Sequence, residues 1–349
     1  LRRQRQMCIR DSLKAIREAM EGKHFQEFKD IDYLPEKLGK RVLTTGGHFG
    51  YLKIAEGCDK HCTYCIIPKL RGKFRSVPME RLVTQAKEMA EEGVKELILV
   101  AQETTVYGTD IYGKKSLHIL LKELCKIKGI RWIRVLYCYP EEIYDELIQT
   151  MKEEKKICHY LDLPIQHASD RILKRMGRRT TQAELVEIVN KLRREIPDIV
   201  LRTTLISGFP GETQEDHEEL MSFVDEMEFD RLGVFTYSPE EDTPAATMPD
   251  QVAEEVKEAR RDEIMELQQE ISYDKGTDRI GQELLVMIEG KVADESAYIG
   301  RTYGDAPKVD GYIFVQTGEL LMTGDFAKVR VTGALEYDLI GELADEYTE

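Results

Sequence analysis

The sequence predicts an α/β protein: a partial (β/α)6 TIM-like barrel followed by a small antiparallel five-stranded β-barrel. Short β-rich apolar runs alternate six times with longer amphipathic runs, and parallel strands need such long connections. Strand runs such as Leu97–Val100 are wholly apolar, which indicates burial on both faces. After residue 275 the pattern changes to short strands separated by turn signals, which is typical of a small barrel.

The elements of the larger unit follow from this alternation. Its predicted helices carry end signals, namely Pro78 in a first turn, Gly93 after a last turn, and a capping box from Thr181 to Glu184. The expected strands are 51–55, 95–101, 132–137, 160–163, 200–206 and 232–236. The expected helices are 78–92, 117–126, 142–152, 181–195 and 214–228. In such a sheet the chemistry lies at the carboxyl ends of the strands.

The chain is expected to divide into three parts. Residues 1–44 form an N-terminal fragment edge and linker, in which Ser12 caps a short helix over Leu13–Met20. Residues 45–275 form the larger unit, which ends in a long charged helix over 251–273. Residues 276–349 form the small barrel, with strands expected at 283–289, 297–301, 311–315, 326–331 and 338–342.

Composition limits the classes of function. The 349 residues hold 50 basic and 65 acidic side chains, a net charge of −15, and a general nucleic-acid binder normally carries a basic surface. Residues 276–349 hold six Lys and Arg against fifteen Asp and Glu, a net charge of −9. No apolar stretch approaches the length of a membrane span and no signal peptide opens the chain. We therefore expect a cytoplasmic protein with no membrane partner, and no nucleic-acid binding.

Three of the seven cysteines, Cys58, Cys62 and Cys65, lie within eight residues directly after a predicted strand. Three thiolates in one loop indicate a single inorganic centre. A structural zinc site takes four protein ligands, and His61 would have to be the fourth. Three thiolates suit a 4Fe-4S cluster in which one iron is left without a protein ligand. The spacing favours the cluster, and a zinc-stabilised scaffold without catalytic activity is the alternative.

The spacing of these cysteines resembles that of the radical S-adenosylmethionine superfamily, and the flanking residues resemble its methylthiotransferases. The similarity is greatest to the members that modify an aspartate of small-subunit ribosomal protein twelve, and it covers about residues 45–345. The matching stretches are 55–57, 65–76, 97–105, 161–167, 208–213, 233–240 and 306–311, the last resembling the terminal TRAM barrel of that subfamily.

The resemblance implies a mechanism. The three cysteines would hold one 4Fe-4S cluster, and the amino and carboxylate groups of S-adenosylmethionine would chelate the open iron. Reductive cleavage would give a 5′-deoxyadenosyl radical, which can take hydrogen from an unactivated carbon such as the β-carbon of aspartate. A reductant protein such as flavodoxin or ferredoxin would supply the electron.

The resemblance also assigns cofactor-binding residues. Tyr64 is expected beside the adenine, Gln102 and Glu103 at the cofactor's amino group, and Gln166, Ser207 and Gly208 at the ribose and adenine. Each has a structural alternative: a strand-end glutamine can satisfy backbone groups, and a glycine can permit a turn. His167 is a candidate proton-transfer group, but a hydrogen-bonded pocket wall is the favoured interpretation.

The resemblance further implies partners and a difference from the family. Complete methylthiotransferases carry an N-terminal domain with a second, auxiliary 4Fe-4S cluster, and upstream of Cys58 this chain has only Cys8. We therefore expect the auxiliary cluster only in a full-length protein. The acidic barrel favours basic ribosomal protein twelve as partner, whereas a tRNA methylthiotransferase, the nearest alternative, would need a positive surface there.

Overall fold

The computed structural model describes residues 9–25, 30–32, 43–293 and 295–344. Its helices are α1 (Ile9–Met20), α2 (Ile67–Arg71), α3 (Met79–Glu91), α4 (Thr109–Tyr112), α5 (Leu117–Cys125), α6 (Asp145–Glu153), α7 (Asp170–Arg175), α8 (Gln182–Glu195), α9 (Gln214–Met227) and α10 (Glu254–Thr277), with 3-10 turns η2 (Pro140–Glu142) and η3 (Pro244–Thr247). Its strands are β1 (Phe49–Lys53), β2 (Ala55–Glu56), β3 (Arg75–Ser76), β4 (Glu96–Val100), β5 (Trp132–Val135), β6 (Ile157–Asp162), β7 (Val200–Ser207), β8 (Arg231–Thr236), β9 (Glu283–Lys291), β10 (Ala297–Arg301), β11 (Ile313–Gln316), β12 (Phe326–Ala334) and β13 (Leu339–Leu343).

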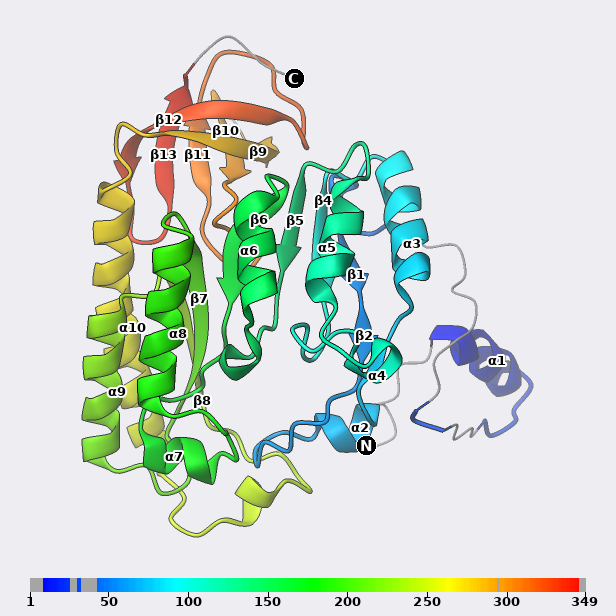
Figure 1. Cartoon of the computed structure of the whole chain (residues 1–349), viewed down its shortest axis with the longest axis vertical. Helices are drawn as coiled ribbons and strands as arrows, with labels where there is room; N and C mark the ends of the chain where they lie inside the picture. The colour runs from blue at the N-terminus through cyan, green and yellow to red at the C-terminus, as the bar shows by residue number, and fades with distance from the viewer. Residues whose placement is uncertain (1–8, 26–29, 33–42, 294, 345–349) are drawn as a thin grey trace.

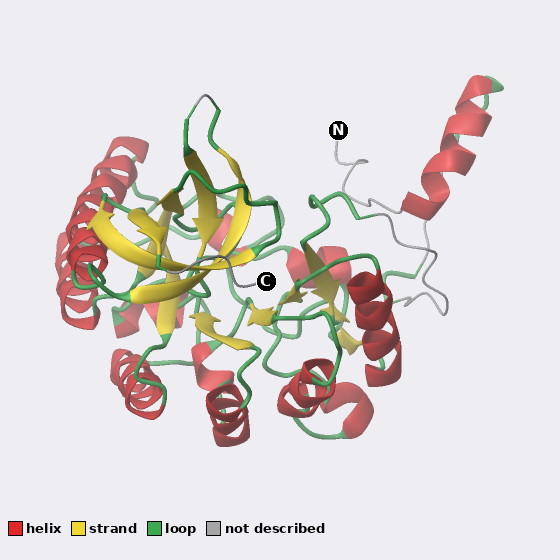
Figure 2. Cartoon of the chain, turned by 90° about the horizontal axis from the view of Figure 1, so that it is seen from above, coloured by secondary structure: helices red, strands yellow, loops and turns green. Residues whose placement is uncertain are grey.

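The larger unit is a six-stranded parallel sheet with strand order β1-β4-β5-β6-β7-β8. Each strand after β1 follows a helical crossover, and Figure 2 shows these helices along the outer side of the strands. The predicted partial (β/α)6 barrel is confirmed. All strand carboxyl ends therefore lie at one edge of the sheet, the lower edge in Figure 1.

Local sequence signals set the helix ends. The predicted capping box is present, because the Thr181 side chain accepts from the backbone N–H of Glu184 while the Glu184 side chain accepts from that of Thr181. A second capping box joins Thr213 and Asp216 at the start of α9. Each box satisfies backbone donors that a helix N-terminus otherwise leaves unpaired.

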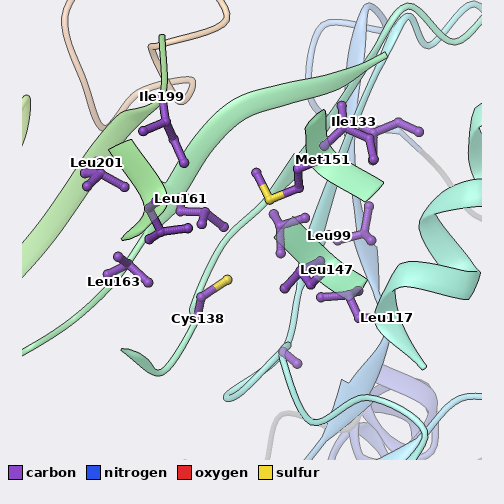
Figure 3. Packing of buried hydrophobic residues seen from close by; sticks show 14 of the residues in the cluster. Leu99, Leu117, Ile133, Cys138, Leu147, Met151, Leu161, Leu163, Ile199 and Leu201 are labelled. Carbon is purple, nitrogen blue, oxygen red and sulfur yellow. The ribbon is translucent and has the colours of Figure 1, made fainter. Parts of the chain in front are cut away.

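A continuous apolar core fills the space between the sheet and its outer helices. Figure 3 shows part of it, in which the Cys138 side chain lies among leucines of neighbouring elements such as Leu147 and Leu161. Cys138 and Cys158 are buried and Cys125 is half-buried. Cys125 ends α5, Cys158 lies in β6, and Cys138 lies in the segment between β5 and η2.

The C-terminal residues form a closed barrel with strand order β10-β11-β13-β12-β9, which confirms the predicted five-stranded module. Four of its neighbouring pairs are antiparallel, whereas β11 and β13 run parallel. The parallel pair arises because β13 returns from the β12 hairpin and inserts between β12 and β11.

The small barrel packs against the amino ends of the sheet strands, at the top of Figure 1. Trp132 and Tyr160 of the sheet join Met287 and Phe326 of the barrel in one apolar cluster, and the rings of Trp132 and Phe326 meet edge-on with centroids 4.8 Å apart. The barrel thereby closes the end of the sheet opposite the strand carboxyl ends.

Two expectations need correction. The first described helix begins at Ile9, so Ser12 lies inside it and is not its N-cap. The strand expected over 51–55 divides at Ile54, after which β2 pairs with β3 instead of continuing in the sheet. The predicted boundaries 1–44, 45–275 and 276–349 stay predictions, and much of the first part lies outside the described residues.

None of the described helices has the length and apolar composition needed to cross a bilayer.

Candidate functional site

The cysteine loop joins β2 to α2 and is bracketed by two glycines. Gly57 has φ +78°, and a Cβ there would lie 2.0 Å from the Lys73 carbonyl oxygen. Gly72 has φ +73°, and its carbonyl accepts from the backbone N–H of Cys58 at 3.2 Å. Only glycine tolerates such backbone angles with this close approach, so these two positions close the loop at its base.

The loop is also fixed at its centre. The backbone N–H and the hydroxyl of Thr63 donate to the carbonyls of Met176 and Arg175, at 2.9 and 2.8 Å, and the Thr63 carbonyl accepts from Ala245 at 2.9 Å. These bonds tie the loop to the end of α7 and to η3. The thiols are therefore held by contacts from several distant segments.

The three thiols are free and enclosed: Cys58 and Cys62 are buried and Cys65 is half-buried. Burial, reinforced by the neighbouring Cys62, Glu103 and Cys65 charges, raises the pKa of Cys58 to about 11. Across the described part of the chain, no three His, Cys, Asp or Glu side chains are grouped so that they could hold a metal ion. Metal ligation requires the thiolate, so binding would release protons from this loop.

A cavity of about 390 Å³ lies beside the thiols, at the carboxyl ends of β1, β4 and β5. This size suits a small-molecule ligand. Its lining includes Cys58, Cys65 and Gln102, so the structure brings together two of the predicted metal ligands and one predicted cofactor-binding residue. The other lining residues are Lys53, Ile67, Val100, Ala101, Tyr137 and Tyr139.

Gln102 and Glu103 follow β4 and have polar atoms without partners among the described residues. These are Oε1 of Gln102 and Oε2 of Glu103. The other oxygen of Glu103 accepts from the backbone N–H and the hydroxyl of Thr105. Burial raises the pKa of Glu103 to about 7. Buried polar atoms normally have hydrogen-bond partners, so Gln102 has unused capacity to accept a bond from a ligand in the cavity, whose lining does not include Glu103.

Of the remaining predicted cofactor residues, Tyr64 lies in the cysteine loop, and Gln166, Ser207 and Gly208 lie near the ends of later strands. The Tyr64 ring packs edge-on against Phe209, with centroids 6.3 Å apart. Gln166 has φ +73°, and its backbone bonds to β7. The Ser207 hydroxyl donates to the Lys257 carbonyl at 3.0 Å, and the Gly208 N–H donates to Glu212 at 2.8 Å. The lining of the cavity includes none of these four, and their cofactor roles stay predictions.

His167 is completely buried. Its Nδ1 accepts from the Ser169 backbone N–H at 3.0 Å, and its Nε2 faces a Glu212 carboxylate oxygen at 3.6 Å. Arg260 also binds Glu212, at 2.9 Å. His167 is not among the residues that line the cavity. His167 is therefore a buried residue beside Glu212, and both of its predicted roles stay predictions.

Sequence reasoning missed the residues that surround Cys62. The Tyr139 hydroxyl lies 3.5 Å from its sulfur, and the Arg178 guanidinium lies 4.2 Å from the centroid of the Tyr139 ring. A second, smaller cavity of about 60 Å³ is lined by Lys60, His61, Cys62, Tyr139, Glu141, Gly177, Arg178 and Arg179. No motif marks Tyr139 or Arg178, and only the fold brings them to the loop.

Known proteins resemble this chain in both units. Residues 52–224 match the Radical SAM superfamily, and residues 280–344 match the TRAM domain. The chain is 64% identical over 328 residues to the ribosomal protein uS12 methylthiotransferase RimO of Lachnoclostridium phytofermentans, covering 94% of this chain and 74% of that protein. It is 57% identical to the RimO of Clostridium perfringens (88% and 68% covered) and 50% identical to that of Clostridium botulinum (95% and 74% covered).

Proposed function

The chain belongs to the family of ribosomal protein uS12 methylthiotransferases RimO, and from this premise we propose that it modifies the β-carbon of an aspartate of uS12. The members of this family are transferases and radical S-adenosylmethionine enzymes, which implies a 4Fe-4S cluster and S-adenosylmethionine as cofactors. The observation that carries the proposal for this chain is the placement of Cys58 and Cys65 on a cavity of about 390 Å³ at the strand carboxyl ends.

The three cysteines fit the cluster by their donor chemistry, although within the described residues their side chains are not grouped around one metal position. Cys58, Cys62 and Cys65 are free thiols on one loop, and three thiolates leave one iron of a 4Fe-4S cluster open to another ligand. When bound, the cluster and S-adenosylmethionine supply the 5′-deoxyadenosyl radical that takes a hydrogen atom from carbon. Cys58, Cys62 and Cys65 would hold the cluster, and the burial of Cys58 and Cys62 would shield it from water.

The cofactor would be oriented by residues at the strand ends. Gln102 lines the cavity and offers a buried oxygen that has no partner among the described residues, which suits an ammonium donor. The unpartnered oxygen of Glu103 suits the same group, because a positive neighbour favours the ionised carboxylate. Tyr64, Gln166, Ser207 and Gly208 are proposed at the adenine and ribose. His167, which does not line the cavity, is proposed as a buried residue that positions Glu212.

The partners follow from charge and chemistry. The small barrel, with a net charge of −9 over residues 276–349, would attract a basic protein such as uS12 and repel the phosphates of tRNA. A flavodoxin or ferredoxin would deliver the electron. The auxiliary cluster stays a prediction; among the described residues, Cys125 lies in α5, Cys158 in β6, and Cys138 between β5 and η2.

The decisive experiment follows hydrogen from substrate to product. The protein is reconstituted with iron and sulfide without oxygen, reduced with dithionite, and given S-adenosylmethionine and uS12 whose aspartates carry deuterium on the β-carbon. The proposal expects deuterium in the released 5′-deoxyadenosine. Unlabelled 5′-deoxyadenosine whose yield rises with tRNA and not with uS12 would favour the tRNA enzyme. Bound zinc, with no iron uptake, would favour the scaffold.

A further inference from the structure

Tyr139 separates the two cavities beside the cysteine loop. It lines the larger cavity together with Cys58 and Cys65, and the smaller one together with Cys62. Its hydroxyl is the group of Tyr139 that reaches Cys62, at 3.5 Å from the sulfur. A phenol is protonated at neutral pH, so towards a thiolate it can act only as a hydrogen-bond donor.

Arg178 lies behind Tyr139 and is only 7% exposed. Its Nη2 donates to the Pro164 carbonyl at 3.0 Å, but its Nε and Nη1 have no hydrogen-bond partner within the described ranges. The carboxylate of Glu141 is 3.8 Å from Nη2, which is longer than a hydrogen bond. Burying a guanidinium with two unpaired donor atoms costs free energy of folding. A negative charge nearby would lower this cost, and the surrounding side chains supply that charge only in part.

Ligation by iron would place that negative charge next to Arg178. The Cys62 sulfur would become a thiolate, and Arg178 and Cys62 line the same small cavity. Two cations lie near the ring between them, because the Lys60 ammonium is 5.1 Å from the Tyr139 centroid and the Arg178 guanidinium is 4.2 Å from it. Cations over an aromatic ring withdraw electron density, which makes the hydroxyl a stronger donor.

We propose that Tyr139 and Arg178 are positioning residues that raise the reduction potential of the cluster through its Cys62 ligand. Tyr139 donates a hydrogen bond to the Cys62 sulfur, and Arg178 adds a positive charge behind that bond. Both favour the form of the cluster that holds one more electron, because hydrogen bonds to sulfur and net charge set the potentials of such clusters. This inference rests on the proposed function, since it requires the cluster.

The test is a redox titration of the reconstituted protein with dithionite, followed by electron paramagnetic resonance of the reduced cluster. The variants are Tyr139→Phe, Arg178→Gln and Arg178→Lys. The matched control is Tyr144→Phe, which removes a hydroxyl that bonds His118 at 3.0 Å. Iron and sulfide content are measured for each protein before titration, so that the potential is compared only between loaded proteins.

At the potential where the original cluster is half reduced, we expect Tyr139→Phe to lower the ratio of reduced to oxidised cluster about fivefold, the usual worth of one hydrogen bond. Arg178→Gln should lower it at least as much, Arg178→Lys should fall between, and Tyr144→Phe should leave it unchanged. If Arg178→Gln does not take up iron, the potential of the cluster in Tyr139→Phe tests the proposal by itself.

Unchanged potentials in loaded Tyr139→Phe and Arg178→Gln would overturn the inference while leaving the proposed function intact, provided that the original protein still forms 5′-deoxyadenosine. Failure of the original protein to take up a cluster would overturn both. A purely structural role for the two residues predicts lower stability or iron content with no change in potential.

Discussion

Two glutamates at opposite ends of one strand show how differently the two ends of the sheet are built. Glu96 begins β4 and Glu103 follows it, and both are almost completely buried. Burial opposes the charge of Glu96, yet Arg301 and Arg134 hold its pKa below the usual value. Burial also opposes the charge of Glu103, and there the pKa rises to about 7. Equal burial gives opposite results because two arginines bind Glu96 directly, whereas the charge of Lys60 offsets only part of the effect of burial on Glu103.

The end that carries Glu96 is a completed interface. Its carboxylate binds Arg134 at 2.8 Å and Arg301 of the small barrel at 2.7 Å, with all three side chains at 0% exposure. Arg231 and Asp305 make a second bond between the units, at 2.6 Å. The end that carries Glu103 has a cavity and free thiols. The first end holds two units together, and the second is left open for ligands.

The largest expected effect is loss of activity, with little change in stability, when a cysteine is removed at the end of the sheet that carries Glu103. Cys62→Ala should reduce 5′-deoxyadenosine formation at least about 100-fold, because two thiolates do not hold the cluster in a reactive position. Unfolding of the metal-free protein by urea should change by no more than about 2 kcal/mol. Cys125→Ala is the control and should keep both iron and activity. Iron retained by Cys62→Ala would contradict the assignment of this ligand.

At the end that carries Glu96, a substitution is expected to lower the stability of the protein. Glu96→Gln should lower the free energy of unfolding by about 3–5 kcal/mol, because Arg134 and Arg301 would stay buried without a carboxylate. Glu283→Gln provides the comparison, since the Glu283–Arg330 pair is exposed and such pairs contribute less than about 1 kcal/mol. Urea unfolding of the metal-free proteins measures both. Equal losses of unfolding free energy in the two variants would show that the contacts of Glu96 with Arg134 and Arg301 do not stabilise the interface.

The third prediction uses pH. The pKa of Glu103 is raised, so between about pH 4.5 and 7 the unfolded chain loses this proton before the folded one, and stability falls as pH rises. Glu103→Gln keeps an acceptor for Thr105 and removes the charge. The variant should be more stable than the original by about 3 kcal/mol at pH 8, and the difference should shrink towards pH 5. A difference that is constant with pH would mean that Glu103 does not titrate in this range.

The smallest expected effect concerns Gln102. Its Oε1 has no partner within the described residues, so Gln102→Leu should change the stability of the metal-free protein by less than about 1 kcal/mol. Binding of S-adenosylmethionine to the loaded protein should weaken about tenfold, because one hydrogen bond to a charged group is lost. Equilibrium dialysis measures the affinity. Unchanged affinity would move the amino-group site away from Gln102.

The sequence predicted what depends on local pattern. The alternation of apolar and amphipathic runs predicted the six strands and their helices, and Thr181 and Glu184 predicted a helix start because both halves of a capping box lie within one turn. Ser12 failed as a cap because the helical turn extends back to Ile9, and a serine can also occupy a helix interior. The β2–β3 pair was missed because two-residue strands have no periodicity to detect.

The candidate site was predictable where its residues are consecutive and not where the fold assembles it. Cys58, Cys62 and Cys65 share one loop, so their spacing alone indicated a common centre. Tyr139 is 77 positions from Cys62, and Glu96 is 205 positions from Arg301. Such contacts depend on how strands align in space, and an isolated tyrosine or arginine carries no sign of them.

The assignment of the three cysteines is tested most directly by metal analysis and electron paramagnetic resonance of the reconstituted, reduced chain, with and without S-adenosylmethionine. The account predicts about four iron and four sulfide per chain beyond those retained by Cys62→Ala. It also predicts a spectrum that changes when the cofactor is added, because one iron is open to it. One zinc per chain, with no iron and no response to the cofactor, would contradict it.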